Sequence, residues 1–172
     1  MKNLTKFFAL SIVMVSFAAN TFAQGVTATA SATATILTPI AITKTVDMNF
    51  GNVAVNATPG TAVLTPASTR SATGGVTFLP ANPGTVTAAS FNVTGLGSAT
   101  YSITLPSVAT TISFGAITMT VNAFTSTPTP TGTLSAGGAQ TLTVGATLNV
   151  GANQAAGVYT SATPFDVTVN YN

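Results

Sequence analysis

The sequence predicts an all-β protein, an antiparallel immunoglobulin-like β-sandwich of about eight to ten strands. Three observations lead to this fold class. Apolar and polar residues alternate with a period of two along most of the chain, and no helical period is found. Clusters of Gly and Pro separate the alternating segments at short spacing. Threonine and valine, which favour strands, are abundant. A closed barrel is the main alternative architecture.

The start of the chain predicts a secretory signal peptide over residues 1–23. Lys2 and Lys6 supply its positive charge, an apolar run follows, and small residues end it at Ala23. The apolar run is shorter than the roughly 20 residues that span a bilayer. We therefore expect cleavage after Ala23, contact with the membrane only during export, and a single domain over residues 24–172. The expected location is the periplasm, the cell surface or the extracellular space.

The predicted mature chain carries almost no charge. Lys44 and Arg70 oppose Asp47 and Asp166, so the formal net charge is zero. Without a basic patch, nucleic acid is not an expected partner. Low charge favours association with copies of the chain or with other surface subunits.

The first mature segment predicts a strand of unusual length over residues 26–37, which is "VTATASATATIL". Side chains on a strand point to opposite faces in turn. One face then carries small apolar residues and the other carries hydroxyls. The apolar face is Val26, Ala28, Ala30, Ala32, Ala34 and Ile36. Three interpretations stay open: pairing within its own domain, pairing with a neighbouring subunit as an inter-subunit strand, or a disordered first half.

Later segments continue the alternating pattern. After Pro39 the apolar residues hold the even positions up to Phe50, and the phase changes at Gly51–Asn52, which predicts a β-bulge or a bend between sheets. "NATPG" (56–60) predicts a turn, and Gly137–Gly138 predicts a two-residue hairpin. The further expected strands are 61–65, 72–79, 86–94, 99–105, 117–124, 140–150 and 165–171.

The side chains that most enzymes use are missing from this sequence. It has no histidine and no cysteine, and Asp47 and Asp166 are its two acidic residues. A Ser–His–Asp or Cys–His site is therefore impossible. A carboxylate pair would need both aspartates together, whereas each is expected on a solvent-facing strand position. We therefore expect no enzymatic activity, no catalytic residues, no metal site and no cofactor.

Several stretches resemble a bacterial secreted family, the domain-of-unknown-function family 4402. They are "ATATILTPIAITKTVDMNFGNVAV", "GGVTF", "AASFNVTG", "YSITLP" and "LTVGATLNVGANQAAGVYT" followed by "FDVTVNYN". The resemblance covers essentially the whole mature chain in order. It implies a β-sandwich in a bacterial surface context, and it implies no catalytic residues.

The end of the chain resembles, more loosely, the spore coat protein U family and the archaic chaperone–usher pilins. Gly157, Tyr159 and Tyr171 stand where those proteins have a glycine-x-tyrosine turn and a final strand ending in tyrosine. In the pilins an N-terminal alternating strand completes the sheet of the neighbouring subunit, and the resemblance gives that role to residues 26–36. This chain departs from the pilins in lacking cysteines and in carrying mostly alanine where a donor strand has bulky side chains.

Two functional hypotheses follow from the sequence. The first is a non-catalytic structural or adhesive, pilin-like subunit at the bacterial surface. The second is a stand-alone secreted sandwich that binds a glycan or another ligand through exposed aromatic side chains, for which Phe114, Phe124 and Tyr101 are the candidates. Burial in the core is the competing explanation for those three aromatic residues.

Overall fold

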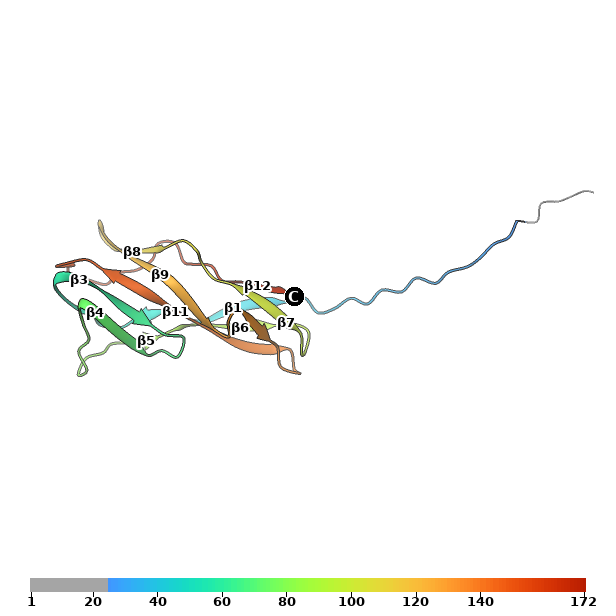
Figure 1. The fold of residues 1–172 in the computed structure, drawn as a ribbon, viewed down its shortest axis with the longest axis horizontal. Helices are drawn as coiled ribbons and strands as arrows, with labels where there is room; N and C mark the ends of the chain where they lie inside the picture. The colour runs from blue at the N-terminus through green and yellow to red at the C-terminus, as the bar shows by residue number, and fades with distance from the viewer. Residues whose placement is uncertain (1–24) are drawn as a thin grey trace, which may run out of the picture. The chain divides into compact units, whose positions relative to one another are not determined.

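The computed structural model describes residues 25–172, and the expected signal peptide lies outside these residues. The folded unit is Ile36–Asn172, and its regular structure consists of twelve strands (Figure 1). Within the described residues, no helix is long and apolar enough to cross a membrane. The predicted all-β antiparallel sandwich is confirmed, with twelve strands where about eight to ten were expected.

The larger sheet is built around β11 (Ala139–Val150), whose alternating apolar residues are buried in the core. β6 (Ala89–Thr94) pairs with its first half and β3 (Ala54–Leu64) with its second half. β9 (Ile117–Thr127) pairs with residues 143–149 of β11, which overlap the stretches that pair with β6 and with β3. β9 therefore lies along the opposite edge of β11. The sheet is completed by β1 (Ala41–Val46) beside β6, β4 (Arg70–Thr77) beside β3, and β8 (Thr110–Phe114) beside β9.

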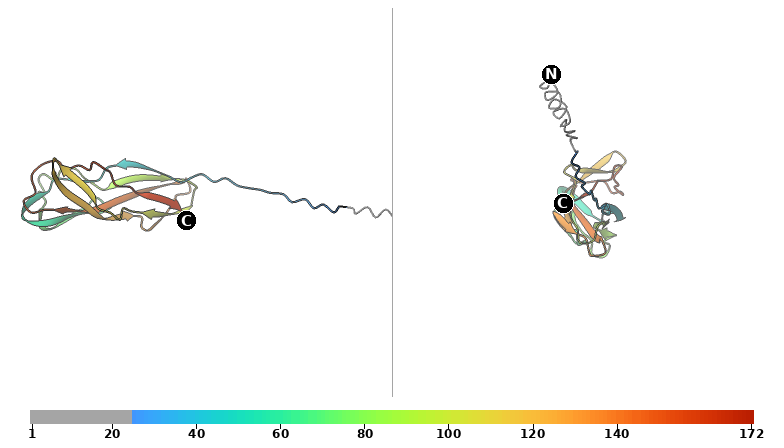
Figure 2. Two further views of the ribbon diagram at one scale, coloured as in Figure 1. Left: turned by 90° about the horizontal axis from the view of Figure 1, so that it is seen from above. Right: turned by 90° about the vertical axis from the view of Figure 1, so that its right-hand side faces the viewer.

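The second layer is a three-stranded antiparallel sheet. β7 (Thr100–Thr104) lies between β10 (Thr131–Thr133) and β12 (Thr168–Tyr171). A separate short ladder joins β2 (Asn49–Phe50) to β5 (Val86–Thr87). Figure 2 shows these strands from two further directions.

Two clusters of buried side chains form the core. The first contains Tyr101, Leu142 and Val169, which come from both sheets and hold the two layers together. The second is built mainly from β3, β9 and β11. Met48 and Phe124 contact both clusters and join them. Such continuous apolar contact is the main source of stability for a domain without disulfides.

The phase change at Gly51–Asn52 marks a change of pairing partner, as predicted. β2 ends at Phe50 and pairs with β5, whereas β3 starts at Ala54 and pairs with β4 and β11. Gly51 has a φ of 69°, in the left-handed region that glycine adopts without steric cost.

Two local predictions are wrong. "NATPG" (56–60) is not a separate turn but an irregularity inside β3, where the register with β4 shifts between Val55 and Gly60. A tight turn does form at Gly137–Gly138, because the N–H of Gly138 donates to the carbonyl oxygen of Ser135 at 2.8 Å and the N–H of Ser135 donates to that of Ala139 at 3.0 Å. The predicted hairpin does not continue as a ladder, since β10 pairs with β7 while β11 pairs with β6. In the first case the pairing of β3 with the next strand, β4, continues on both sides of the segment. In the second case the flanking strands belong to different sheets, which local turn residues do not encode. β8 and β10 were also missing from the predicted strands.

The strand predicted over residues 26–37 is not formed within the chain. These residues belong to no strand, and every one of them is exposed. Within the described residues the segment forms no ladder, and where it pairs stays a prediction. The physical reason for the missing ladder is that an alanine face offers little apolar area to bury, so the segment gains little by returning to its own sheet.

Candidate assembly surface

The extended segment, residues 25–37, has the properties of a strand that lacks a partner. Val26 is 97% exposed and Ile36 is 96% exposed, although both are apolar. No described residue pairs with its backbone, so its N–H and C=O groups are free to form a ladder with another strand. The apolar row singled out from the sequence, Val26, Ala28, Ala30, Ala32, Ala34 and Ile36, lies entirely in this segment.

The folded unit holds the chain firmly just after this segment. The hydroxyl of Tyr171 donates to the carbonyl oxygen of Thr38 at 2.8 Å, and it accepts from the backbone N–H of Leu96 at 2.6 Å. Pro39 follows, and a residue before proline is confined to extended conformations. The hydroxyl of Tyr171 therefore holds Thr38 at the start of the folded unit.

One side of the sandwich is bounded by two strands that each have a free edge. β1 ends the order of the larger sheet, and β12 ends the order of the smaller one. The two strands are in contact and lie close together near the C-terminus (Figure 1). Apolar residues of both strands, such as Ile42 and Tyr171, belong to the first core cluster but are only partly buried.

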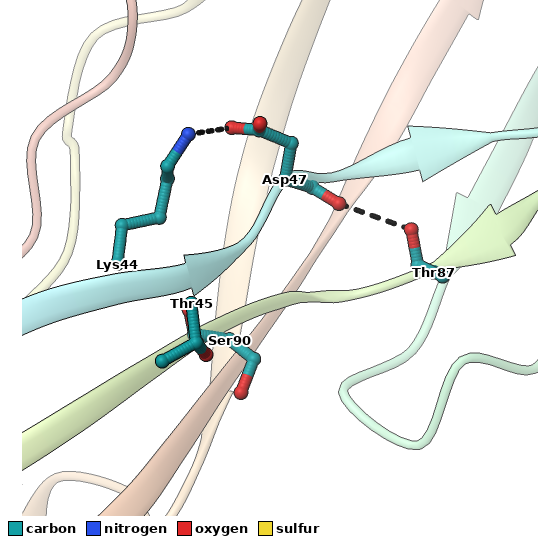
Figure 3. A network of polar contacts seen from close by, with 5 residues as sticks. All are labelled: Lys44, Thr45, Asp47, Thr87 and Ser90. Atoms are coloured by element: carbon teal, nitrogen blue, oxygen red, sulfur yellow. Dashed lines mark hydrogen bonds and ion pairs between the residues drawn. The ribbon is translucent and has the colours of Figure 1, made fainter.

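The edge strand β1 has polar features that hinder pairing with a further strand. β1 carries Lys44, which forms an exposed ion pair with Asp47 (Figure 3). Thr45 Oγ1 donates to the carbonyl oxygen of Ser90 at 3.0 Å, and Thr87 Oγ1 donates to that of Asp47 at 3.0 Å. The register between β1 and β6 shifts between Lys44 and Val46. A charged side chain and an irregular register are features that protect an edge strand from pairing.

The two carboxylates lie in different surroundings. Asp47 contacts Lys44, whereas Asp166 borders an open depression of about 540 Å³ between residues 106–113 and 162–166. Both aspartates are exposed, and Asp47 is not among the residues that line the depression. Over residues 25–172 no group of three or more His, Cys, Asp or Glu side chains is placed to hold a metal ion. Asp166 therefore borders this depression without Asp47.

The three aromatic residues that are candidates for ligand binding differ in burial. Tyr101 is fully buried and donates to Gln140 Oε1 at 2.8 Å, and burial raises its pKa. Phe124 is in the core, with its ring centroid 4.9 Å from that of Phe165. Phe114, at the end of β8, is 45% exposed and lies 5.8 Å from the ring of Tyr159.

An apolar patch around Phe114 was not found from the sequence. Val158 is 79% exposed and Ile117 is 42% exposed. Ser113 and Thr160 exchange two backbone hydrogen bonds, which hold the loop after β11 against β8. The only sequence signal was the glycine at 157, where a Cβ would lie 2.4 Å from the Phe114 ring.

Comparison with known proteins identifies the folded unit. The family model described as a domain of unknown function (DUF4402) matches residues 40–171, which include every strand of the structure. No curated protein and no solved structure shows significant similarity to the chain.

Proposed function

We propose, from the premise that the chain belongs to the DUF4402 family, that it is a non-catalytic exported bacterial surface protein. Its role in this proposal is that of a structural or adhesive, pilin-like subunit that assembles with copies of itself or with other surface subunits. The observation that carries the proposal is the extended segment. Residues 25–37 alternate like a strand, yet they are exposed and have no partner among the described residues.

Physical reasoning supports a strand that pairs between subunits. A free segment with alternating small apolar and hydroxyl side chains is suited to β-strand addition, in which main-chain hydrogen bonds supply affinity. An uncharged segment meets no electrostatic repulsion from a second uncharged copy. The nearly neutral surface of the mature chain also favours self-association over solubility as a monomer.

The first experiment compares residues 24–172 with residues 38–172 by size-exclusion chromatography with light scattering and by negative-stain microscopy. The shorter protein keeps all twelve strands and Thr38. We expect oligomers or filaments from the longer protein and monomers from the shorter one. Assembly by both proteins, or by neither, would contradict the proposal.

A substitution in the longer protein removes the effect of chain length. Thr29→Pro with Thr33→Pro deletes two backbone N–H donors from a segment that makes no contact of its own with a strand. We expect this variant to stay monomeric with an unchanged melting temperature. Thr29→Ser with Thr33→Ser keeps both donors and is the matched control, which should assemble like the unsubstituted protein.

Export is tested separately. Expression of all 172 residues in a bacterium with two membranes should yield a chain that begins at Gln24, and mass spectrometry of the purified protein would measure this. A chain retained in the cytoplasm at full mass would overturn this part of the proposal.

Phe114 supports a second candidate function, the binding of a glycan. Exposed aromatic rings can stack on the apolar faces of sugars, and Phe114 is the exposed member of the three aromatic candidates. On a glycan array, Phe114→Ala should abolish any binding that the intact protein shows. Val108→Ala, at a residue that is 78% exposed, is the control.

A further inference from the structure

The backbone of β12 presents unpaired hydrogen-bonding groups on the side away from β7. The N–H of Asn172 donates to the carbonyl oxygen of Thr100 on the β7 side at 3.3 Å. In an antiparallel ladder the backbone groups of alternate residues point to the same side, so those of Asn170 also face β7. The N–H and C=O groups of Val169 and Tyr171 then face the free edge.

A backbone hydrogen bond of β7 supports this assignment of the groups of Val169 and Tyr171. Ile103, which lies opposite Val169, donates its N–H to the carbonyl oxygen of Pro130 on the far side of β7 at 2.9 Å. Val169 and Ile103 therefore do not bond to each other. Among the described residues, no strand pairs with the outer edge of β12.

The edge of β12 is also the least protected edge of the two sheets. β1 has Lys44 and a register shift, and β10 has three residues that directly follow a proline. β8 is partly covered, because Ser113 pairs with Thr160. β4 begins with Arg70 and contains a register shift relative to β3. β12, "TVNY", has no charge, no proline and no register shift, and so lacks the usual barriers to pairing.

The first core cluster already packs side chains of the domain beneath β12, where Val169 is 8% exposed and Tyr171 is partly buried. Tyr101 and Leu142 are completely buried, and Phe165 contacts Phe124 inside the first cluster. None of the residues that line the open depression belongs to β12. A strand that joins this edge therefore needs no bulky side chains to fill a gap. The small apolar side chains of such a strand can lie beside the apolar row of Val167, Val169 and Tyr171 without displacing any side chain of the domain.

We propose that the free edge of β12 is the acceptor for residues 26–36 of a second copy of this chain, which adds as an extra strand to the smaller sheet. The inference rests on the assembly function proposed above. The small alanine face of the incoming strand suits an edge whose apolar residues, Val169 and Tyr171, already pack against the first cluster. Addition at this edge extends a finished domain, so residues 38–172 fold without a partner.

A second copy is favoured over the chain's own segment by the residues around the anchor. Thr38 is bonded to Tyr171, the last residue of β12, and Pro39 keeps Thr38 extended. Pairing within one chain would need a sharp reversal beside this fixed point. The length also fits a second copy. Residues 26–36 span about 36 Å as a strand, and four residues of β12 span about 13 Å, which leaves the remainder to link one domain to the next.

Disulfide crosslinking tests the acceptor directly, because the chain has no cysteine of its own. One variant carries Ser31→Cys and a second carries Asn170→Cys, both at exposed positions with polar side chains. The two are mixed and oxidised, and peptides that join positions 31 and 170 are identified by mass spectrometry. Thr29→Cys and Thr33→Cys replace Ser31→Cys in turn to sample the register. A disulfide needs Cα atoms about 4.4–6.8 Å apart, so it reports adjacency.

We expect the crosslink between the segment and residue 170, at least tenfold above the crosslink to Thr43→Cys on the outer side of β1. Equal or stronger linkage to Thr43→Cys would overturn the assignment to β12. A chain that carries both Ser31→Cys and Asn170→Cys and closes a disulfide within one monomer at high dilution would overturn pairing with a second copy.

A lysine placed on the edge separates this inference from the proposed function. Asn170→Lys adds a charge at an exposed position of β12 and should abolish assembly while leaving the melting temperature of the monomer unchanged. Thr43→Lys is the matched control and should still assemble. If residues 24–172 assemble, residues 38–172 do not, and Asn170→Lys still assembles, then the function stands and the β12 acceptor is wrong. If residues 38–172 assemble as well, the proposed function itself fails.

Discussion

The hydroxyl of Tyr171 bonds to the carbonyl oxygen of Thr38 at 2.8 Å, across 133 positions of sequence. The same hydroxyl accepts from the N–H of Leu96 at 2.6 Å. One phenol oxygen thus ties the last strand to the start of the folded unit and to the loop after β6. Gly95 makes room for it, because a Cβ at that position would lie 2.2 Å from the oxygen.

Tyr171→Phe should lower the free energy of unfolding by about 1–3 kcal/mol, because the N–H of Leu96 and the C=O of Thr38 lose their partner. Urea denaturation of residues 38–172 measures the change. Hydrogen exchange should become faster at Leu96 and stay unchanged at Ser113, whose N–H bonds to Thr160 far from the substitution in sequence. Unchanged exchange at Leu96 would contradict this account of the anchor.

Tyr101 should make the domain sensitive to alkaline pH. Burial raises the pKa of its phenol above the ordinary value of about 10. On raising the pH, the unfolded chain therefore loses this proton before the folded one does. The contribution of the protonated Tyr101 phenol to the free energy of unfolding is complete below about pH 10. It is lost as the pH rises through the folded-state pKa.

Tyr101→Phe checks this pH dependence. The variant loses the hydrogen bond to Gln140, so it should be less stable at neutral pH. Between about pH 9 and pH 11 its urea midpoint should fall less steeply than that of the unsubstituted protein. Parallel curves for the two proteins would show that Tyr101 does not govern the alkaline loss of stability.

Arg70 should contribute more to stability than any other charged side chain. Its guanidinium donates to the carbonyl oxygens of Phe50, Asn52 and Pro83, and it lies 4.1 Å from the ring centroid of Phe78. Arg70→Lys keeps the charge but not the planar group that serves three acceptors. We expect a loss of about 2–4 kcal/mol in the free energy of unfolding.

Lys44→Ala is the control for Arg70, because it removes an exposed cation. The exposed Lys44–Asp47 pair should contribute less than about 1 kcal/mol. Calorimetry of the two variants side by side gives the comparison. A larger effect for Lys44→Ala than for Arg70→Lys would reverse this ranking.

Gly145 should be intolerant of any side chain. It lies in β11 where β6 gives way to β3 as the pairing partner. A Cβ there would be 2.2 Å from the carbonyl oxygen of Leu64 and 2.6 Å from the carbonyl carbon of Thr65, both backbone atoms. Gly145→Ala should destabilise the domain by at least about 1–3 kcal/mol. Gly137→Ala, whose Cβ meets only Ser135 Oγ at 3.8 Å, should change stability far less.

Sequence reasoning worked best where pattern and burial coincide. The alternation in residues 140–150 predicted β11, and the phase change at Gly51 predicted a change of partner. It failed where the two layers decide the pairing. The glycines at 137–138 suggested a hairpin, but the strands on either side of them belong to different sheets. β10 was missed because its three residues gain their partners only from β7.

The role of residues 26–36 as an inter-subunit strand stays a prediction. The aromatic candidates show what the sequence could not resolve. Phe114, Phe124 and Tyr101 looked equivalent in sequence, and only Phe114 is exposed. Burial depends on what the other strands place above a side chain, and no local pattern contains that information.

By itself the sequence determined the all-β class, the near absence of charge and the alternating segment at residues 26–37, because composition and period-two spacing are local properties. Only the tertiary structure decided which strands pair in each sheet and that β12 ends the smaller one. Each of these depends on which strands complete one another's backbone hydrogen bonds across long separations. Such pairing is settled by the packing of the two sheets around one core.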